Sequence, residues 1–190
     1  MIENMMVEPA KKTIRLLVLG LGNVLLGDDG LGAAAVARLE RTYRIPPEVQ
    51  LEDGGTLGMA LLGMIAESDR VILVDAVRTD SPPGTLVRID GEEVMDAVRD
   101  RLSPHQVGVA DLLDAARLID SYPVSVTLLG LVPEKIELSV VRTGAVEAGL
   151  DMLVAAIVCE VQSLGYKMSP EAESETRAYP MRDLTHYFGM

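Results

Sequence analysis

Cysteine is almost absent from this chain, since Cys159 is the only one among 190 residues. A single cysteine excludes an intrachain disulfide and a cysteine-rich metal site. Because Cys159 lies in an apolar stretch near the C-terminus, we expect a small core residue rather than a reactive thiol. This usage fits a reducing compartment and predicts a cytoplasmic protein.

Long hydrophobic segments are also missing. The apolar run MLVAAIVC near the C-terminus is far shorter than a membrane-spanning helix. The N-terminal sequence MIENMMVEPAKK mixes acidic residues with lysines and lacks the apolar segment of a signal peptide. We therefore expect a soluble, intracellular protein that has no membrane partner.

Basic residues are outnumbered, with 17 lysines and arginines against 29 aspartates and glutamates, and the formal net charge is -12. Nucleic acids and anionic membrane surfaces would be repelled at long range, so neither is an expected partner. A partner that is cationic or that carries a metal ion is easier to accommodate.

The hydrophobic residues form alternating strand and helix patterns around what should be one core. Continuous aliphatic runs predict buried strands, and apolar residues at helical spacing predict the helices between them. Met59 and Met64 are expected to lie in the core. We expect strands at 13–22, 48–53, 70–77, 84–90 and 124–132, and helices after Asp29, around 57–65, at 103–119 and at 143–164.

The connection between the third and fourth strands sets the sheet type. Its SPPG turn is too short for a parallel crossover, so the strand at 84–90 should run antiparallel at an edge. The predicted fold class is therefore α/β: a three-layer sandwich with a mostly parallel twisted sheet, one antiparallel edge strand and helices on both faces. The domain should span 13–166, and a polar, mobile tail should follow at 167–190.

The first strand leads into the glycine-rich loop GLGNVLLGDDGLG. Gly20 and Gly22 match the first two glycines of a dinucleotide fingerprint, but Leu25 occupies the place of the third, which lets helix and strand approach. The loop also lacks the Gly-Lys-Ser/Thr ending of a P-loop. Asp28 and Asp29 would neutralise the anion site of a helix N-terminus, so phosphate binding is disfavoured.

Two interpretations of the acidic residues stay open. Asp28 and Asp29 could cap the following helix and complement its dipole, or one of them could face a ligand. Asp75 interrupts the apolar run ILVDAV at the end of its strand, either as a ligand or bonded to a nearby loop. Because the carboxyl ends of strands line the ligand crevice in open α/β sheets, Asp29 and Asp75 can meet there.

Histidine is scarce, with two in the chain. The motif SPHQ combines an N-cap serine, Ser103, with proline and glutamine at favoured positions, which places His105 in the first turn of a helix. The positive end of the helix dipole favours a neutral imidazole there, able to bind a metal ion or accept a proton, although a plain surface histidine is the alternative. We assign no role to His186, and Asp53 is typical of a turn residue that could at most support a site.

Six motifs can be considered together: GLGNVLLGDDGLG, LEDGGTLGMALLG, VILVDAV, PPGTLV, LSPHQVGVADLL and VTLLGLVPE. In this order and at these spacings they resemble the hydrogenase maturation proteases, the endopeptidases that finish the large subunit of nickel-iron hydrogenases. The resemblance runs from about residue 14 to 165 and leaves the tail outside. Its specificity lies in the combination, because any one glycine motif alone would be weak.

The resemblance implies an α/β sheet flanked by helices and a metal-facing triad of two carboxylates and one histidine. On this sequence the triad is Asp29 of DDG, Asp75 at a strand end and His105 of SPHQ. The family often has glutamate where this chain has Asp29, whose side chain is shorter by one methylene. Two carboxylates and one imidazole suit a divalent transition ion with positions left open for other ligands.

The resemblance also implies a substrate, the precursor of a hydrogenase large subunit that already holds nickel. The triad would recognise this nickel, and the protease would then remove the C-terminal extension of the precursor. Nickel is thus carried by the substrate and is no permanent cofactor. The triad would serve as metal ligands and as catalytic groups, with the ion polarising the carbonyl or activating water and Asp29 or Asp75 helping proton movement.

Other functions remain as alternatives. The protease signatures H-E-x-x-H and Gly-x-Ser-x-Gly are absent from the sequence. The same triad could capture nickel for delivery and cut nothing, because residues that hold a metal and residues that use it are of the same types. A nucleotide-binding regulatory domain would need phosphate at the glycine loop, which the two aspartates disfavour.

Overall fold

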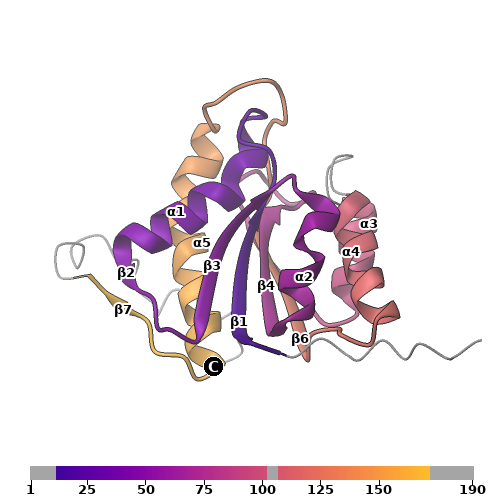
Figure 1. Ribbon diagram of the computed structural model, residues 1–190. Coiled ribbons are helices and arrows are strands. Elements are labelled where there is room, and N and C mark those ends of the chain that lie inside the picture. The colour runs from indigo at the N-terminus through magenta and orange to yellow at the C-terminus, as the bar shows by residue number, and fades with distance from the viewer. Residues whose placement is uncertain (1–11, 102–106, 172–190) are drawn as a thin grey trace, which may run out of the picture.

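The computed structural model describes residues 12–101 and 107–171, and a five-stranded sheet forms its centre (Figure 1). The strand order is β3-β1-β4-β6-β5, in which the first four strands are parallel and β5 is antiparallel to β6. This arrangement confirms the predicted sheet with one antiparallel edge strand. The strands are β1 (Ile14–Leu21), β3 (Val49–Gly55), β4 (Ser68–Ala76), β5 (Leu86–Asp90) and β6 (Ser125–Leu131).

Helices cover both faces of the sheet, so the predicted three-layer α/β architecture is confirmed. One face carries α1 (Leu31–Thr42) and α5 (Gly144–Ser163), and the other carries α2 (Leu62–Ala66), α3 (Glu93–Arg101) and α4 (Val107–Leu118). The 3-10 turns η1 (Asp28–Gly30) and η2 (Gly58–Leu61) precede α1 and α2. Within residues 12–101 and 107–171, no helix combines the length and the apolar character needed to cross a membrane.

β1 lies inside the sheet because its side chains are buried on both faces. Leu16 and Val18 face the layer of α1 and α5, whereas Leu17 and Leu19 face the layer of α2 to α4. Burying one such side chain contributes about 1.5–3 kcal/mol relative to leaving it exposed. The aliphatic run therefore favours a strand covered on both sides over an edge strand.

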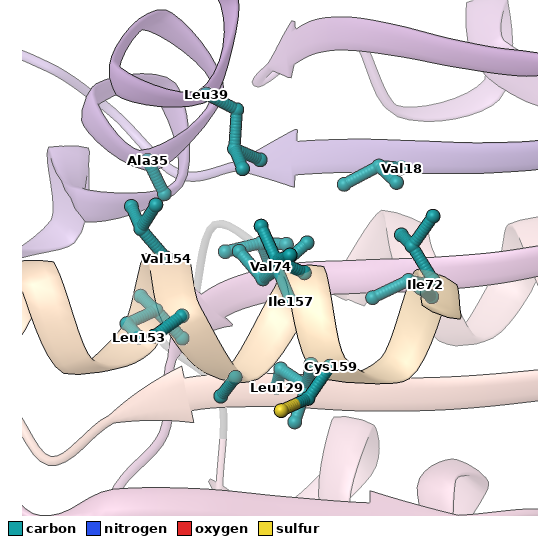
Figure 2. Packing of buried hydrophobic residues seen from close by; sticks show 14 of the residues in the cluster. Val18, Ala35, Leu39, Ile72, Val74, Leu129, Leu153, Val154, Ile157 and Cys159 are labelled. Atoms are coloured by element: carbon teal, nitrogen blue, oxygen red, sulfur yellow. The ribbon is translucent and has the colours of Figure 1, made fainter. Parts of the chain in front are cut away.

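α5 packs its apolar face across the sheet, as Figure 2 shows. Leu153, Val154 and Ile157 belong to one buried cluster with the strands. In Figure 2, Val154 lies beside Ala35 of α1 and Ile157 lies beside Val74 of β4. Cys159 belongs to the same cluster and is 5% exposed, and burial raises the pKa of its thiol. The expected core position of this cysteine is confirmed.

α1 approaches the sheet closely at two glycines. A Cβ atom on Gly32 would lie 2.3 Å from the Leu21 carbonyl oxygen and 2.5 Å from the Val74 carbonyl oxygen. A Cβ atom on Gly20 would lie 2.6 Å from the Gly32 carbonyl oxygen, so neither position has room for a side chain. Gly32 thus provides the close helix–strand contact that we sought at Leu25, and it holds the loop after β1 over the ends of β1 and β4.

Two local predictions are wrong. No element was expected at α3, because its sequence EVMDAVRDR is mostly charged, yet Val94, Met95 and Val98 are buried against the sheet. Met59 was expected in the core but is 50% exposed in η2, since that short turn presents it to solvent. Met64 is partly buried and packs against the core as expected.

The chain after α5 also differs from expectation within its described part. β7 (Ser169–Pro170) pairs antiparallel with β2 (Tyr43–Arg44), and Met168 is buried beside them. These residues therefore form regular structure where we expected none. Residues 172–190, which include His186, lie outside the described residues, and the domain boundary at 166 stays a prediction.

Candidate active site

Asp29 and Asp75 lie at the carboxyl ends of neighbouring strands. Asp29 follows β1 in η1, and Asp75 is the residue before the last of β4. β1 and β4 pair in parallel as far as Gly20 and Val74. The helix that follows β1, α1, packs on one face of the sheet. The helices that follow β4 and β5, α3 and α4, pack on the other face, so the connections change face between β1 and β4. Such a switch point is where open α/β sheets bind their ligands.

Gly22 lies against both aspartates. Its φ is +105°, a left-handed value that favours glycine. A Cβ atom there would lie 1.8 Å from the Asp29 carbonyl oxygen and 3.5 Å from Asp75 Oδ1. The missing side chain lets η1 fold down onto the end of β4, and the two predicted acids therefore share one neighbourhood.

The Asp29 carboxylate is 1% exposed and only half satisfied. The backbone N–H of Asn23 donates to Oδ2 at 2.8 Å, whereas Oδ1 is buried and finds no hydrogen-bond partner in the described part of the chain. A buried polar atom without a partner costs about 1–3 kcal/mol, and more when it is charged. An oxygen held in this state fits a site that takes up a cation or a hydrogen-bond donor.

Asp75 is fully buried and follows the apolar run VILV of β4. The Ala76 amide donates to Asp75 Oδ1 at 2.6 Å. β6 supports this position closely, because a Cβ atom on Gly130 would lie 2.0 Å from the Asp75 carbonyl oxygen. Two buried carboxylates at one switch point repel each other as anions, and a divalent cation between them would relieve that repulsion.

Asp28 has a different role from its neighbour. Its carboxylate is fully buried and accepts hydrogen bonds from the loop between β6 and α5, not from α1. Neither Asp28 nor Asp29 accepts a hydrogen bond from the first turn of α1 as far as the structure describes them, so capping by hydrogen bonds is a wrong interpretation. No local sequence pattern indicates this contact, because the loop lies more than a hundred residues further along the chain.

The third predicted residue, His105, lies outside the described residues, as does the helix start predicted at Ser103. The described part of that helix, α4, begins at Val107 and ends at Leu118, close to the predicted end. Across residues 12–101 and 107–171, no three His, Cys, Asp or Glu side chains are grouped so that they could hold a metal ion. A three-ligand site therefore stays a prediction that depends on His105.

Asp53 behaves as the expected turn residue at the carboxyl end of β3. Its Oδ1 accepts a hydrogen bond of 3.1 Å from the Gly55 amide, and its side chain is exposed. This contact is the local turn that aspartate commonly forms with the backbone two residues later. Asp53 lies opposite Gly20 in the register of β1 and β3, so it shares the edge but is not buried with the other acids.

The sequence matches the family model described as hydrogenase maturation protease over residues 33–160, a stretch that includes Asp75 and begins shortly after Asp29. The hydrogenase 2 maturation protease of Escherichia coli strain K12 is 39% identical over 158 residues, which cover 83% of this chain and 96% of that protein. The hydrogenase expression/formation protein HupD of Rhodobacter capsulatus is 36% identical, covering 86% of this chain and 79% of that protein.

Solved structures agree with the sequence matches. The hydrogenase maturating endopeptidase HybD from E. coli superposes with a TM-score of 0.80 at 38% identity, covering 85% of this chain and 100% of that one. The maturation protease HybD from Thermococcus kodakarensis gives a TM-score of 0.63 at 26% identity, covering 76% and 97% of the two chains. This chain therefore belongs to the hydrogenase maturation proteases, a family of hydrolases that act as endopeptidases.

Proposed function

We propose that this protease removes the C-terminal extension from the nickel-loaded large-subunit precursor of a nickel-iron hydrogenase. The family supplies the endopeptidase activity, and the relative named hydrogenase 2 maturation protease supports a hydrogenase as the substrate. The observation that carries the nickel part is the buried Asp29 carboxylate, whose Oδ1 has no donor among the described residues. The Asp29 backbone and the Asp75 carboxylate both lie beside Gly22, which brings the two acids into one neighbourhood. We place this reaction in the cytoplasm.

In this proposal Asp29, Asp75 and His105 recognise nickel that the substrate brings. Carboxylate oxygens together with an imidazole nitrogen bind divalent transition ions and leave positions open for the substrate's own ligands. The ion arrives and leaves with the precursor, so it is part of the substrate. A precursor without nickel would offer no cation to the buried Oδ1 of Asp29, which has no donor among the described residues, and should bind weakly.

The same carboxylates would serve in the cleavage of the peptide bond. A water oxygen attacks the scissile carbonyl carbon, the C–N bond breaks, and a proton passes from the water to the departing amine. Asp29 or Asp75 would carry this proton, and a divalent ion held beside them can polarise the carbonyl or activate the water. Cys159 is unsuited as a nucleophile, because it lies in the core and burial raises the pKa of its thiol.

Incubation of the purified chain with two forms of one precursor tests the proposal. We expect the nickel-loaded precursor to be shortened by the mass of its C-terminal extension, as measured by mass spectrometry, and the nickel-free form to stay intact. If the loaded precursor stays intact while nickel moves between the two proteins, the function is nickel delivery and the proposal is overturned.

The two histidines offer a matched pair of variants. His105→Ala should abolish processing, whereas His186→Ala should process the loaded precursor at the rate of the unaltered chain. Circular dichroism and the unfolding midpoint of both variants should match those of the unaltered chain, so that a loss of processing reports on the reaction and not on folding. Equal processing by the two variants would remove His105 from the site.

A further inference from the structure

The β6–α5 loop, residues 132–143, is fastened to the turn that carries Asp29. Asp28 makes four hydrogen bonds to it: Oδ2 accepts from the Glu134 amide at 2.9 Å, the Lys135 amide at 3.0 Å and Thr143 Oγ1 at 2.9 Å, and Oδ1 accepts from the Thr143 amide at 2.7 Å. Hydrogen bonds to an ionised acceptor are about twice as strong as neutral ones. One buried carboxylate thus binds both ends of the loop.

Backbone contacts fasten the middle of the loop. The Gly27 amide donates to the Ser139 carbonyl oxygen at 2.7 Å, and the Ser139 amide donates to the Leu25 carbonyl oxygen at 2.9 Å. Bridges also join Leu26 to Ser139 and Gly27 to Ile136. In Figure 1 the orange loop before α5 and the indigo loop after β1 both rise above the same end of the sheet. The two loops therefore form one unit beside Asp29.

This unit exposes aliphatic side chains that contribute nothing to the core. The side chains of the β1–η1 loop are about half exposed and those of the β6–α5 loop are mostly exposed. Their exposed fractions are 53% for Val24, 53% for Leu25, 86% for Leu138, 76% for Val140 and 73% for Val141. We call these five residues the aliphatic rim. Exposed apolar surface beside a site is typical of a surface that binds a partner.

We propose that Asp28 is a positioning residue, which fastens the aliphatic rim beside Asp29 so that the rim docks an apolar stretch of the precursor polypeptide. This inference rests on the proposed function, since it names what the same site contacts beyond the metal. An endopeptidase must seat an extended polypeptide, and a chain that reaches Asp29 crosses the loops that hold it. Lys135 and Glu137 of the same loop are also exposed and pair with each other at 3.9 Å, so the contacts that the rim itself offers favour apolar side chains.

Kinetics of Asp28→Asn test the positioning role. Asparagine has the shape of aspartate, but its amide nitrogen cannot accept from the donors of the loop, so at least one hydrogen bond is lost. We expect KM for the nickel-loaded precursor to rise at least about fivefold while kcat stays within about twofold, because docking is weakened and the acids remain. A purely structural role would lower the unfolding midpoint and the active fraction and leave KM unchanged.

Variants of the rim test the same inference without touching a buried group. Leu138→Ser combined with Val140→Ser should raise KM by a similar factor and leave the unfolding midpoint unchanged, since both side chains are mostly exposed. The matched control is Leu118→Ser combined with Val124→Ser, whose side chains are 86% and 79% exposed at the opposite edge of the sheet. The control should keep KM at the value of the unaltered chain.

The outcomes separate this inference from the proposed function. The kinetics use a nickel-loaded precursor that the unaltered chain shortens, so failure of that first reaction counts against the proposed function. An unchanged KM in the rim variant, or an equal rise in the rim variant and its control, overturns the docking surface. If Asp28→Asn does not fold, the rim variant alone decides, because its two positions are surface positions.

Discussion

The two ends of the sheet, at the C-termini and at the N-termini of the parallel strands, differ in whether they bury carboxylates. We call them the carboxyl edge and the opposite edge. At the carboxyl edge, Asp28, Asp29 and Asp75 are each at most 1% exposed. At the opposite edge the charges stay at the surface, where Arg15 pairs with Asp69 at 2.8 Å and their side chains are 65% and 26% exposed. Burying a carboxylate is costly, whereas an exposed ion pair costs and contributes little. The costly arrangement is the one that needs a functional explanation.

Aliphatic exposure does not distinguish the two edges by itself. Leu118 and Val124 at one edge are as exposed as Leu138 and Val140 at the other. What sets the carboxyl edge apart is the combination of exposed aliphatic side chains with buried acids, one of which, Asp29, has an oxygen without a donor among the described residues. A buried carboxylate oxygen without a hydrogen-bond donor therefore indicates the site. The exposed aliphatic side chains are a candidate docking surface only because they lie beside that carboxylate.

Removing the charge of Asp29 should have the largest effect. In Asp29→Asn the amide oxygen can still accept from the Asn23 amide, while the amide nitrogen replaces the oxygen that has no donor. We expect processing of the loaded precursor to fall about a thousandfold, as when one preorganised charged or polar group is lost from an active site. The unfolding midpoint should stay the same or rise, because a buried unsatisfied charge is gone.

A carboxylate at the opposite edge serves as the control for this variant. Asp69→Asn should keep the processing rate of the unaltered chain, since Asp69 pairs with Arg15 at the surface and lies at the start of β4. Comparable losses in the two variants would show that the contrast between the edges has no bearing on function. Mass-spectrometric rates for both variants at saturating precursor provide the measurement.

Crowding at the carboxyl edge predicts the largest loss of stability. Gly130→Ala would place a Cβ atom 2.0 Å from the Asp75 carbonyl oxygen, so β6 or β4 must shift. We expect the free energy of unfolding to fall by about 3 kcal/mol, the upper part of the range for overpacking. Urea unfolding followed by circular dichroism measures the loss.

Gly144→Ala is the control for crowding at the same edge. Gly144 begins α5, and no atom of the described chain lies within 4 Å of the Cβ position there. Its free energy of unfolding should change by less than about 0.5 kcal/mol, as for an ordinary surface substitution. A loss as large as that of Gly130→Ala would mean that close packing at the end of β6 is not the cause.

The architecture was predictable from the sequence because its signals are local. The aliphatic run of β1 and the apolar spacing of α5 each specify an element without reference to the rest of the chain, and the SPPG turn specifies the antiparallel edge. α3 was missed because five of the nine residues in EVMDAVRDR are charged and only burial against the sheet reveals its apolar face. β7 was missed for a similar reason, since two residues form a strand only when β2 lies beside them.

The candidate site was predictable only in part. Asp75 was recognisable as an acid inside an apolar strand, and the position of Asp29 at the same edge follows from the parallel sheet. The division of labour between Asp28 and Asp29 was not, because it depends on which neighbour reaches each carboxylate after folding. Asn23 reaches Asp29 from six residues away, whereas Thr143 reaches Asp28 from 115 residues away.

Cys159 lies in the core, away from the buried acids of the candidate site. Cys159→Ala should keep the full processing rate and lose about 1 kcal/mol of stability, because a small buried group is removed from the α5 cluster. Burial raises the pKa of the thiol, so little thiolate exists at neutral pH and an alkylating reagent should modify the native chain slowly. Rapid alkylation that stops processing would instead place a reactive thiol in the mechanism.

Substitutions at Gly58 and Gly63 should have the smallest effects on stability. They test the contribution of backbone conformation separately from that of crowding. At both positions no atom in the described part of the chain lies within 4 Å of an added Cβ, so crowding is absent and only the backbone differs. Gly63 lies in α2, where alanine is the better helix former, and Gly63→Ala should raise the free energy of unfolding by about 0.5–1 kcal/mol. Gly58 has a φ of +51°, so Gly58→Ala should lower it by about 1 kcal/mol. If the free energy of unfolding changes with the same sign in both variants, backbone conformation does not govern these two positions. The loss in Gly130→Ala could then no longer be assigned to crowding alone.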